Sequence, residues 1–159
     1  MRALNILTTF ILMFVTIMVV AQNKEERKID SFDKLDVFGN IYVEMIKGDK
    51  ESVVITTKNV DLSEVNTEVN DKLLKINMKS NLFDDDAEVR ITLTYKEIRE
   101  IASNASAEII AKEMIKGDKL FVNATSGGRI ELKVDLNAIE LKAYQGAHID
   151  ISGKSRIQE

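Results

Sequence analysis

The chain has 159 residues, enough for one ordinary domain, and a formal net charge of −4. The absence of cysteine excludes disulfides, thiol chemistry and cysteine-ligated zinc, and the single histidine, His148, excludes paired catalytic histidines and two-histidine metal sites. No basic face is visible in this acidic chain, so nucleic acid is not an expected partner, and we expect neither a metal nor a cofactor.

Residues 1–21 are predicted to be a secretory signal peptide. Arg2 gives a short basic start, residues 3–20 carry no charge, and Ala21 is the small residue before the cleavage site. An uncleaved anchor is the alternative, because the apolar run is close to the minimum of about 17–20 residues for a membrane span. We expect cleavage, no stable membrane span afterwards, and an exported protein in the periplasm, on the outer surface or in the medium.

Residues 22–28 are expected to form a polar leader, and residues 29–159 a single domain without an internal linker. The clearest strand signal is 89–95, where apolar and polar residues alternate as in a half-buried strand. The predicted strands of this first part are 35–37, 41–45, 53–57, 73–78 and 89–95. Polar turn-like groups separate them at 47–50, 70–72 and 84–86.

The second half of the chain repeats with a period near 20 residues. Ile109, Ile130 and Ile149 are 21 and 19 residues apart, and strand-like segments follow the first two. Units this short bury their apolar faces only by stacking on neighbours, which predicts an all-β fold of the β-solenoid type with parallel strands. Helix propensity instead favours helices in 96–101 and 107–116. We predict strand and turn there, as the repeat does, because the stacking of neighbouring units often overrides helix propensity.

A small residue lies two positions before each repeated isoleucine: Ala107, Gly128 and Ala147. Small residues fit crowded corners, and glycine also permits positive φ, so this column is expected to form the corners of the stack. The alternative is a shallow groove in which a ligand approaches the backbone.

The order of these pieces resembles a known family. The segments 29–44, 65–69, 73–76 and 91–95, followed by the Ser-Gly-Gly-like repeats, are similar to the head GIN domain of auto-transporter adhesins. The resemblance covers roughly residues 29–153. It implies a right-handed parallel β-helix-like fold with turns of about 20 residues, an exported location typical of Bacteroidetes proteins, and an adhesin role without catalytic residues.

The chain departs from that family pattern in two places. Ser106-Ala107 replaces the glycine-rich corner of the first repeat, and the chain stops at Glu159 just after Ser152-Gly153, where another turn is expected to open. The domain is therefore either truncated at its C-terminus or protects its last strand in another way. An open parallel edge invites pairing with another chain, so we expect self-association through the C-terminal edge.

Five residues are candidates for binding. Glu131 and Asp150 occupy equivalent repeat positions, about 4.8 Å apart in an in-register stack. Such a pair could hold a cation, or act as the carboxylates of a retaining glycosidase, which lie about 5–5.5 Å apart. We favour an exposed polar face with Lys133 nearby. Glu108, Arg129 and His148 fall in one column and are expected to form a surface ladder rather than a metal site.

Asp84-Asp85-Asp86 could supply oxygens to a calcium ion, but it lacks the spaced Asp-x-Asp-x-Asp-Gly pattern and is expected to be a solvated turn. No phosphate-binding loop, nucleophile elbow or zinc-protease motif is present. The favoured hypothesis is an exported, non-enzymatic adhesin or cell-envelope interaction module that binds an unknown protein or glycan. The alternatives are a polysaccharide-acting β-helix enzyme that uses the paired carboxylates, and a purely structural envelope protein.

Overall fold

The computed structural model describes residues 23–78 and 86–158, so the predicted signal peptide and most of the aspartate run 84–86 lie outside the described residues. The described part is built from strands and one short 3₁₀ turn, η2 (Leu62–Glu64), and it contains no α-helix. The prediction of an all-β fold is confirmed. The segments 96–101 and 107–116, which helix propensity favours as helices, contribute instead to strands and their connections.

The strands have the following bounds. They are β1 (Asn23–Lys28), β2 (Lys34–Phe38), β3 (Tyr42–Lys47), β4 (Ser52–Lys58), β5 (Val65–Asn70), β6 (Leu73–Met78), β7 (Glu88–Tyr95), β8 (Glu100–Asn104), β9 (Glu108–Ala124), β10 (Arg129–Ala143) and β11 (His148–Gln158). The described part of the expected leader 22–28, residues 23–28, thus forms β1, which pairs antiparallel with β4.

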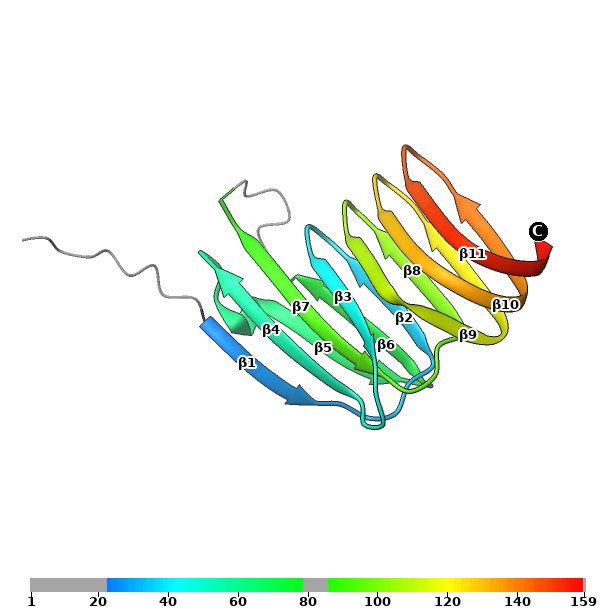
Figure 1. The fold of residues 1–159 in the computed structure, drawn as a ribbon. Coiled ribbons are helices and arrows are strands. Elements are labelled where there is room, and N and C mark those ends of the chain that lie inside the picture. The colour runs from blue at the N-terminus through cyan, green and yellow to red at the C-terminus, as the bar shows by residue number, and fades with distance from the viewer. Residues whose placement is uncertain (1–22, 79–85, 159) are drawn as a thin grey trace, which may run out of the picture.

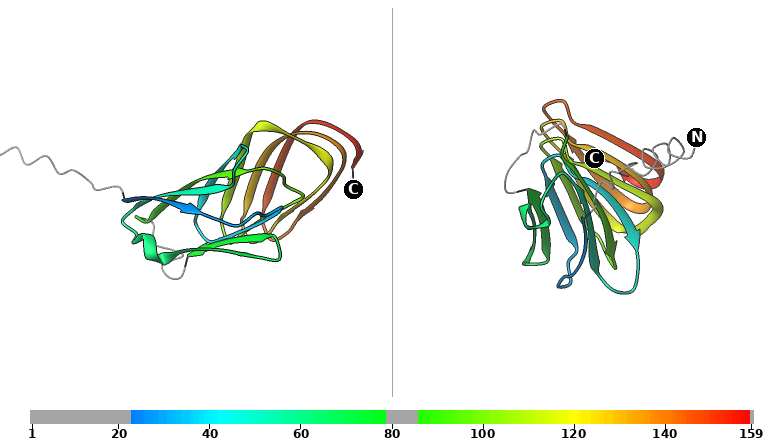
Figure 2. Two further views of the ribbon diagram at one scale, coloured as in Figure 1. Left: turned by 90° about the horizontal axis from the view of Figure 1, so that it is seen from below. Right: turned by 90° about the vertical axis from the view of Figure 1, so that its left-hand side faces the viewer.

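All strands of the described residues belong to one 11-stranded sheet that curls into a half-barrel with two facing halves (Figure 1, Figure 2). One half runs β1-β4-β7-β3 and continues into the N-terminal parts of β9, β10 and β11. The other half runs β5-β6-β2-β8 and continues into the C-terminal parts of β9 and β10. The strand that the repeat predicts within 107–116 and the strand-like segment that follows it are therefore the two arms of one long bent strand, β9.

The spatial order of the strands differs from their order in the chain. β2 lies between β6 and β8, and β3 lies between β7 and β9, with every one of these pairs parallel. The unit β2–β3 is thus inserted between two units that follow it in the chain. β1, β4 and β5 pair antiparallel with their neighbours. The regular succession of parallel units is therefore confined to the strands from β8 onward.

The register of the strands aligns apolar side chains into a continuous spine between the two halves. In the first half, neighbouring strands bring together one inward residue each: Ile55, Ile91, Val43, Ile109, Ile130 and Ile149. In the facing half, the corresponding residues are Leu74, Leu35, Ile101, Val122 and Leu141. Most of these side chains are buried in the core. The three repeated isoleucines are therefore direct neighbours, as the repeat predicts.

Tight turns connect the two halves at one rim of the stack. In each of three successive turns the two central residues have positive φ, which is the geometry of a type I′ turn. The pairs are Ala105 and Ser106, Ser126 and Gly127, and Gln145 and Gly146. Gly127 and Gly146 thus adopt the positive φ that glycine permits. Each lies one position before an expected corner residue, Gly128 or Ala147.

The expected corner residues are small for another reason. A Cβ atom on Gly128 would lie 2.4 Å from the carbonyl oxygen of Ser103, so the neighbouring backbone leaves no room for a side chain. Ala107 is likewise fully buried. These two positions are packed corners, and the alternative of an open groove there is wrong.

Gly153, which with Ser152 was expected to open another turn, also has a different role. Gly153 lies within β11 and pairs with Val134, so Ser152-Gly153 does not open another turn. Its φ is 117°, and a Cβ atom there would lie 2.0 Å from the Val134 carbonyl oxygen. Glycine allows the close approach of β11 to β10.

The N-terminal end of the stack is closed by a clamp on Arg27. The guanidinium of Arg27, on β1, donates hydrogen bonds to the carbonyl oxygens of Val65 at 2.6 Å and Leu62 at 2.9 Å, and to Thr67 Oγ1 at 3.2 Å. It also pairs with Glu25 at 2.8 Å. Because β1 and β5 are the terminal strands of the two halves, this one side chain ties the halves together and covers the end of the core.

The spine makes a prediction about stability. Ile109→Ala should lower the free energy of unfolding by about 2–5 kcal/mol, because Ile109 is 0% exposed and the substitution leaves a cavity. Ile149→Ala, at the same repeat position, should cost clearly less, because Ile149 is only partly buried at the last strand. Urea unfolding measures both. Equal losses would mean that the last unit is as well packed as the first.

Candidate functional site

The outer surface of the first half carries the charged column that the repeat predicts. The register pairs Arg129 with Glu108 on one side and with His148 on the other. On β3, Tyr42 continues the column next to Glu108, and Arg90 follows on β7, with its guanidinium 5.1 Å from the centre of the Tyr42 ring. The structure therefore brings Glu108, Arg129 and His148 together and extends their column by two further residues.

The second candidate pair is also adjacent. Glu131 and Asp150 are register partners on β10 and β11, and both are exposed. The neighbour of Glu131 on the other side is Ile110, not a basic residue. Within 23–78 and 86–158, no group of three or more His, Cys, Asp or Glu residues is arranged to hold a metal ion. The arrangement offers two solvated carboxylates that can contact a cationic group of a partner.

A bulge in β9 brings further charges to this surface. The register shifts between Leu132 and Lys133, where β9 carries the two extra residues Lys112 and Glu113. Lys112 Nζ lies 2.9 Å from Glu44 Oε1, and this hydrogen-bonded carboxylate raises the pKa of Lys112. Glu113 accepts a hydrogen bond of 3.3 Å from the backbone N–H of Lys47. The repeat alignment did not place these two residues, because the bulge interrupts it.

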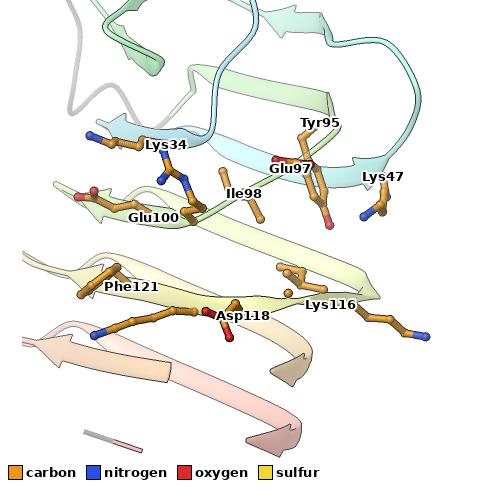
Figure 3. Close-up of a pocket in the computed structure, with 13 residues that line it drawn as sticks. Lys34, Lys47, Tyr95, Glu97, Ile98, Glu100, Lys116, Asp118 and Phe121 are labelled. Atoms are coloured by element: carbon orange, nitrogen blue, oxygen red, sulfur yellow. The ribbon is translucent and has the colours of Figure 1, made fainter. Parts of the chain in front are cut away.

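A cleft of about 730 Å³ opens between the β7–β8 connection and the bend of β9 (Figure 3). Its volume lies within the range of about 300–1,000 Å³ that is usual for small-molecule sites. It has an apolar floor and a charged rim. The apolar lining is Tyr95, Ile98, Ile115 and Phe121. The charged lining is Lys34, Lys47, Arg99, Lys116 and Lys119 with Glu97, Glu100 and Asp118.

Cations outnumber carboxylates in this cleft. Lys119 Nζ lies 4.3 Å from the centre of the Phe121 ring and 3.4 Å from Glu140 Oε2, and Arg99 forms an ion pair with Asp33. For Lys47 the structure shows no ion pair with any described residue. An anionic group that enters the cleft would thus meet a cation that is not already neutralised.

Tyr95 is the residue of the cleft that sequence reasoning missed. Its side chain is 2% exposed, and its buried hydroxyl has no hydrogen-bond partner among the described residues. In Figure 3 the ring points into the space between the β7–β8 connection and β9. Burial raises the pKa of the phenol, and the Glu113 carboxylate raises it further. The group therefore stays protonated and can donate one hydrogen bond. The sequence signal that could have identified it is its position: Tyr95 is a tyrosine at an inward position of the alternating strand 89–95.

Several comparisons with known proteins bear on this fold. The family model described as "Putative auto-transporter adhesin, head GIN domain" matches residues 31–159. The comparison with curated proteins gives no match. Within 23–78 and 86–158, no helix has the length and hydropathy of a membrane span.

Solved structures share the fold at low sequence identity. A protein described as a putative adhesin from Parabacteroides distasonis has a TM-score of 0.74 at 18% identity, covering 85% of this chain and 63% of its own length. A putative lipid binding protein from the same organism has a TM-score of 0.61 at 19% identity, covering 84% and 67%. A putative adhesin from Parabacteroides merdae has a TM-score of 0.56 at 14% identity, covering 87% and 95%.

The unpaired hydroxyl of Tyr95 makes a prediction for the free protein. Tyr95→Phe should raise the free energy of unfolding by about 1 kcal/mol, because it removes a buried polar group that has no partner while keeping the ring. Thermal unfolding of the two forms measures the difference. A loss of stability instead would mean that the hydroxyl has a hydrogen-bond partner in solution.

Proposed function

The chain belongs to the family described as "Putative auto-transporter adhesin, head GIN domain", and from that premise we propose that it is an exported, non-enzymatic module of the cell envelope that binds an extended protein or glycan. The adhesin descriptions of proteins with the same fold support this proposal. The predicted signal peptide 1–21 supports export, and periplasm, outer surface and medium are all consistent with it.

The observation that carries the proposal is the regular outer surface of β3, β9, β10 and β11. Its charged and polar side chains recur at one strand spacing, about 4.8 Å, and stand on a backbone that the stacked core holds rigid. We name the outer surface formed by Glu108, Arg129, Glu131, His148 and Asp150 the ladder face. A surface on which acidic, basic and polar side chains recur at a fixed spacing suits a long, periodic partner, which can contact several steps at once.

The scaffold of this surface is proposed to be a β-solenoid with turns of about 20 residues. The parallel register of β9, β10 and β11 and the repeat of three type I′ turns support it. A right-handed course is proposed because parallel crossover connections are right-handed in about 98% of cases.

The proposed binding can be tested by charge exchange on the ladder face. Arg129→Glu combined with Glu131→Lys keeps the net charge and should weaken binding of the mature chain to envelope fractions about tenfold, or about 1.4 kcal/mol. The matched control is Glu68→Lys with Lys75→Glu, which exchanges a facing pair on β5 and β6. Pull-down titration of labelled protein measures both variants.

Three results would contradict the proposal. Unchanged binding of the Arg129/Glu131 variant would remove the ladder face from the interaction, and absence of binding to cells, glycans and envelope proteins would leave the structural alternative. Turnover of a polysaccharide that is lost in Glu131→Ala with Asp150→Ala would favour the enzyme alternative. Protease treatment of intact cells gives an independent check, because an adhesin must be accessible from outside.

A second candidate function is binding of a small anionic amphiphile in the cleft. Lys47 and the apolar floor of the cleft favour it. A carboxylate or phosphate could pair with Lys47, which has no ion pair with any described residue, while the apolar chain of the ligand covers the floor. The fold is shared with a protein described as lipid binding, which is consistent with this reading.

The cleft is tested with laurate as the probe and dodecyltrimethylammonium as its cationic counterpart. Calorimetry should detect laurate alone, and Lys47→Glu should weaken its binding several-fold, while Lys72→Glu, on the turn between β5 and β6, should not. Equal binding of the two amphiphiles, or laurate binding that Lys47→Glu does not change, would overturn this candidate.

A further inference from the structure

The long strand β9 lacks a neighbour on one side over its middle part. On that side it pairs with β3 through residues 108–111 and with β8 through residues 121–124, while β10 pairs with its other side from residue 108 to residue 124. Between the first two pairings, no strand within 23–78 and 86–158 pairs with residues 112–120 on this side. A regular stack has no such gap, because each unit covers the edge of the next.

The gap follows from the spatial order of the strands. β3 ends at Lys47, and the chain then turns back to β4, which lies beyond β7 in the sheet. The β7–β8 connection, 96–99, crosses the gap without forming a strand. Among the described residues, its one backbone hydrogen bond to β9 runs from the Phe121 N–H to the Arg99 carbonyl oxygen, at 2.9 Å. The cleft of about 730 Å³ is the space between this connection and β9 (Figure 3).

The edge of β9 in this gap exposes main-chain polar groups. Successive residues of a parallel strand direct their N–H and C=O groups alternately to its two neighbours, so about half of the residues in 112–120 direct these groups toward the gap. On that side they form no backbone hydrogen bond with a described residue. Gly117 lines the cleft and has no side chain, so main-chain atoms form this part of the wall. Unpaired groups at a strand edge are a template for another extended chain.

The charges beside this edge define the chemistry of a partner. Lys47 and Lys116 lie at the same end of the cleft, and neither forms an ion pair with a described residue (Figure 3). The acidic groups on this part of β9 already accept hydrogen bonds, Glu113 from the Lys47 backbone N–H and Asp118 from Asn137. A strand with alternating acidic and apolar residues would present carboxylates to the two lysines and apolar side chains to the floor of the cleft.

We propose that an extended acidic segment of another protein adds a short strand to β9 in this gap, between the end of β3 and the start of β8. Main-chain hydrogen bonds supply the affinity of such a strand addition, and its alternate side chains supply the specificity. The cleft-lining residues 115–119 extend over about 13 Å, at about 3.3 Å per residue, so the added strand has about five residues.

This inference goes beyond the adhesive function proposed above, because the cleft contains none of the residues of the ladder face. It also differs from the binding of an anionic amphiphile. An amphiphile can use the lysines and the apolar floor, but only a peptide main chain can pair with the alternating N–H and C=O groups of a strand edge.

The probe is the hexapeptide acetyl-Glu-Val-Glu-Val-Glu-Val-amide, titrated into the mature chain, residues 22–159, by calorimetry. It should bind with a dissociation constant below about 1 mM, and the counterpart with lysine in place of glutamate should not. N-methylation of the three glutamates blocks one edge of the peptide, and N-methylation of the three valines blocks the other edge. Because one edge meets β9, one methylated form should bind about tenfold more weakly, while the other should bind like the parent.

Two measurements locate the peptide on the protein. Lys116→Glu should weaken binding several-fold, whereas the matched control Lys154→Glu should not. Both lysines are exposed and both are register partners of Asp135, but Lys154 lies outside the cleft. Amide hydrogen exchange measured by NMR should slow within residues 112–120 when the peptide binds, because main-chain pairing protects these groups.

Four outcomes overturn the proposal: no binding of the acidic peptide, parent-like binding of both methylated forms, equal effects of the two lysine variants, or unchanged hydrogen exchange within 112–120. The Arg129→Glu/Glu131→Lys variant should bind the peptide normally, so failure of the ladder face and failure of the strand addition are distinguishable. Laurate binding without peptide binding would leave the amphiphile as the occupant of the cleft.

Discussion

Parallel strands that stack in register oblige each inward side chain to lie on the equivalent side chain of the next strand. Here that constraint aligns residues from Ile91 to Ile149 into one spine and from Leu74 to Leu141 into another. The same register aligns the outward residues, because side chains alternate between faces along a strand. The apolar core and the charged ladder face are thus two consequences of one pairing pattern.

The strands also determine where the protein can interact. A regular stack of this kind satisfies its backbone hydrogen bonds between neighbours and leaves only its ends unsatisfied. Arg27 covers one end with hydrogen bonds to the opposite half, and at the other end β11 pairs only with β10 among the described strands. The lateral surfaces, in contrast, are exposed to solvent and charged, and the cleft beside Tyr95 lies where the β7–β8 connection bridges two units.

The sequence predicted much of the C-terminal half and less of the N-terminal half. Ile109, Ile130 and Ile149 could be aligned because their spacing along the chain is close to one turn, so the local repeat carries the three-dimensional contact. The same alignment brought Glu131 to Asp150 and Arg129 to Glu108 and His148. It predicted the roles of the glycines less well. The turn glycines with positive φ are Gly127 and Gly146, while Gly153 allows close contact between two strands.

By itself, the sequence determined the all-β character, the direction of the core-facing side chains and the column of candidate residues, because alternation and repeat length act between residues that are near in the chain or equivalent in the repeat. Only the tertiary structure decided the insertion of β2–β3 between later units, the strand formed by 23–28, and the clamp in which Arg27 reaches Val65, 38 positions away. The cleft around Tyr95 belongs with these. Such contacts join segments that share no repeat, and no local pattern encodes them.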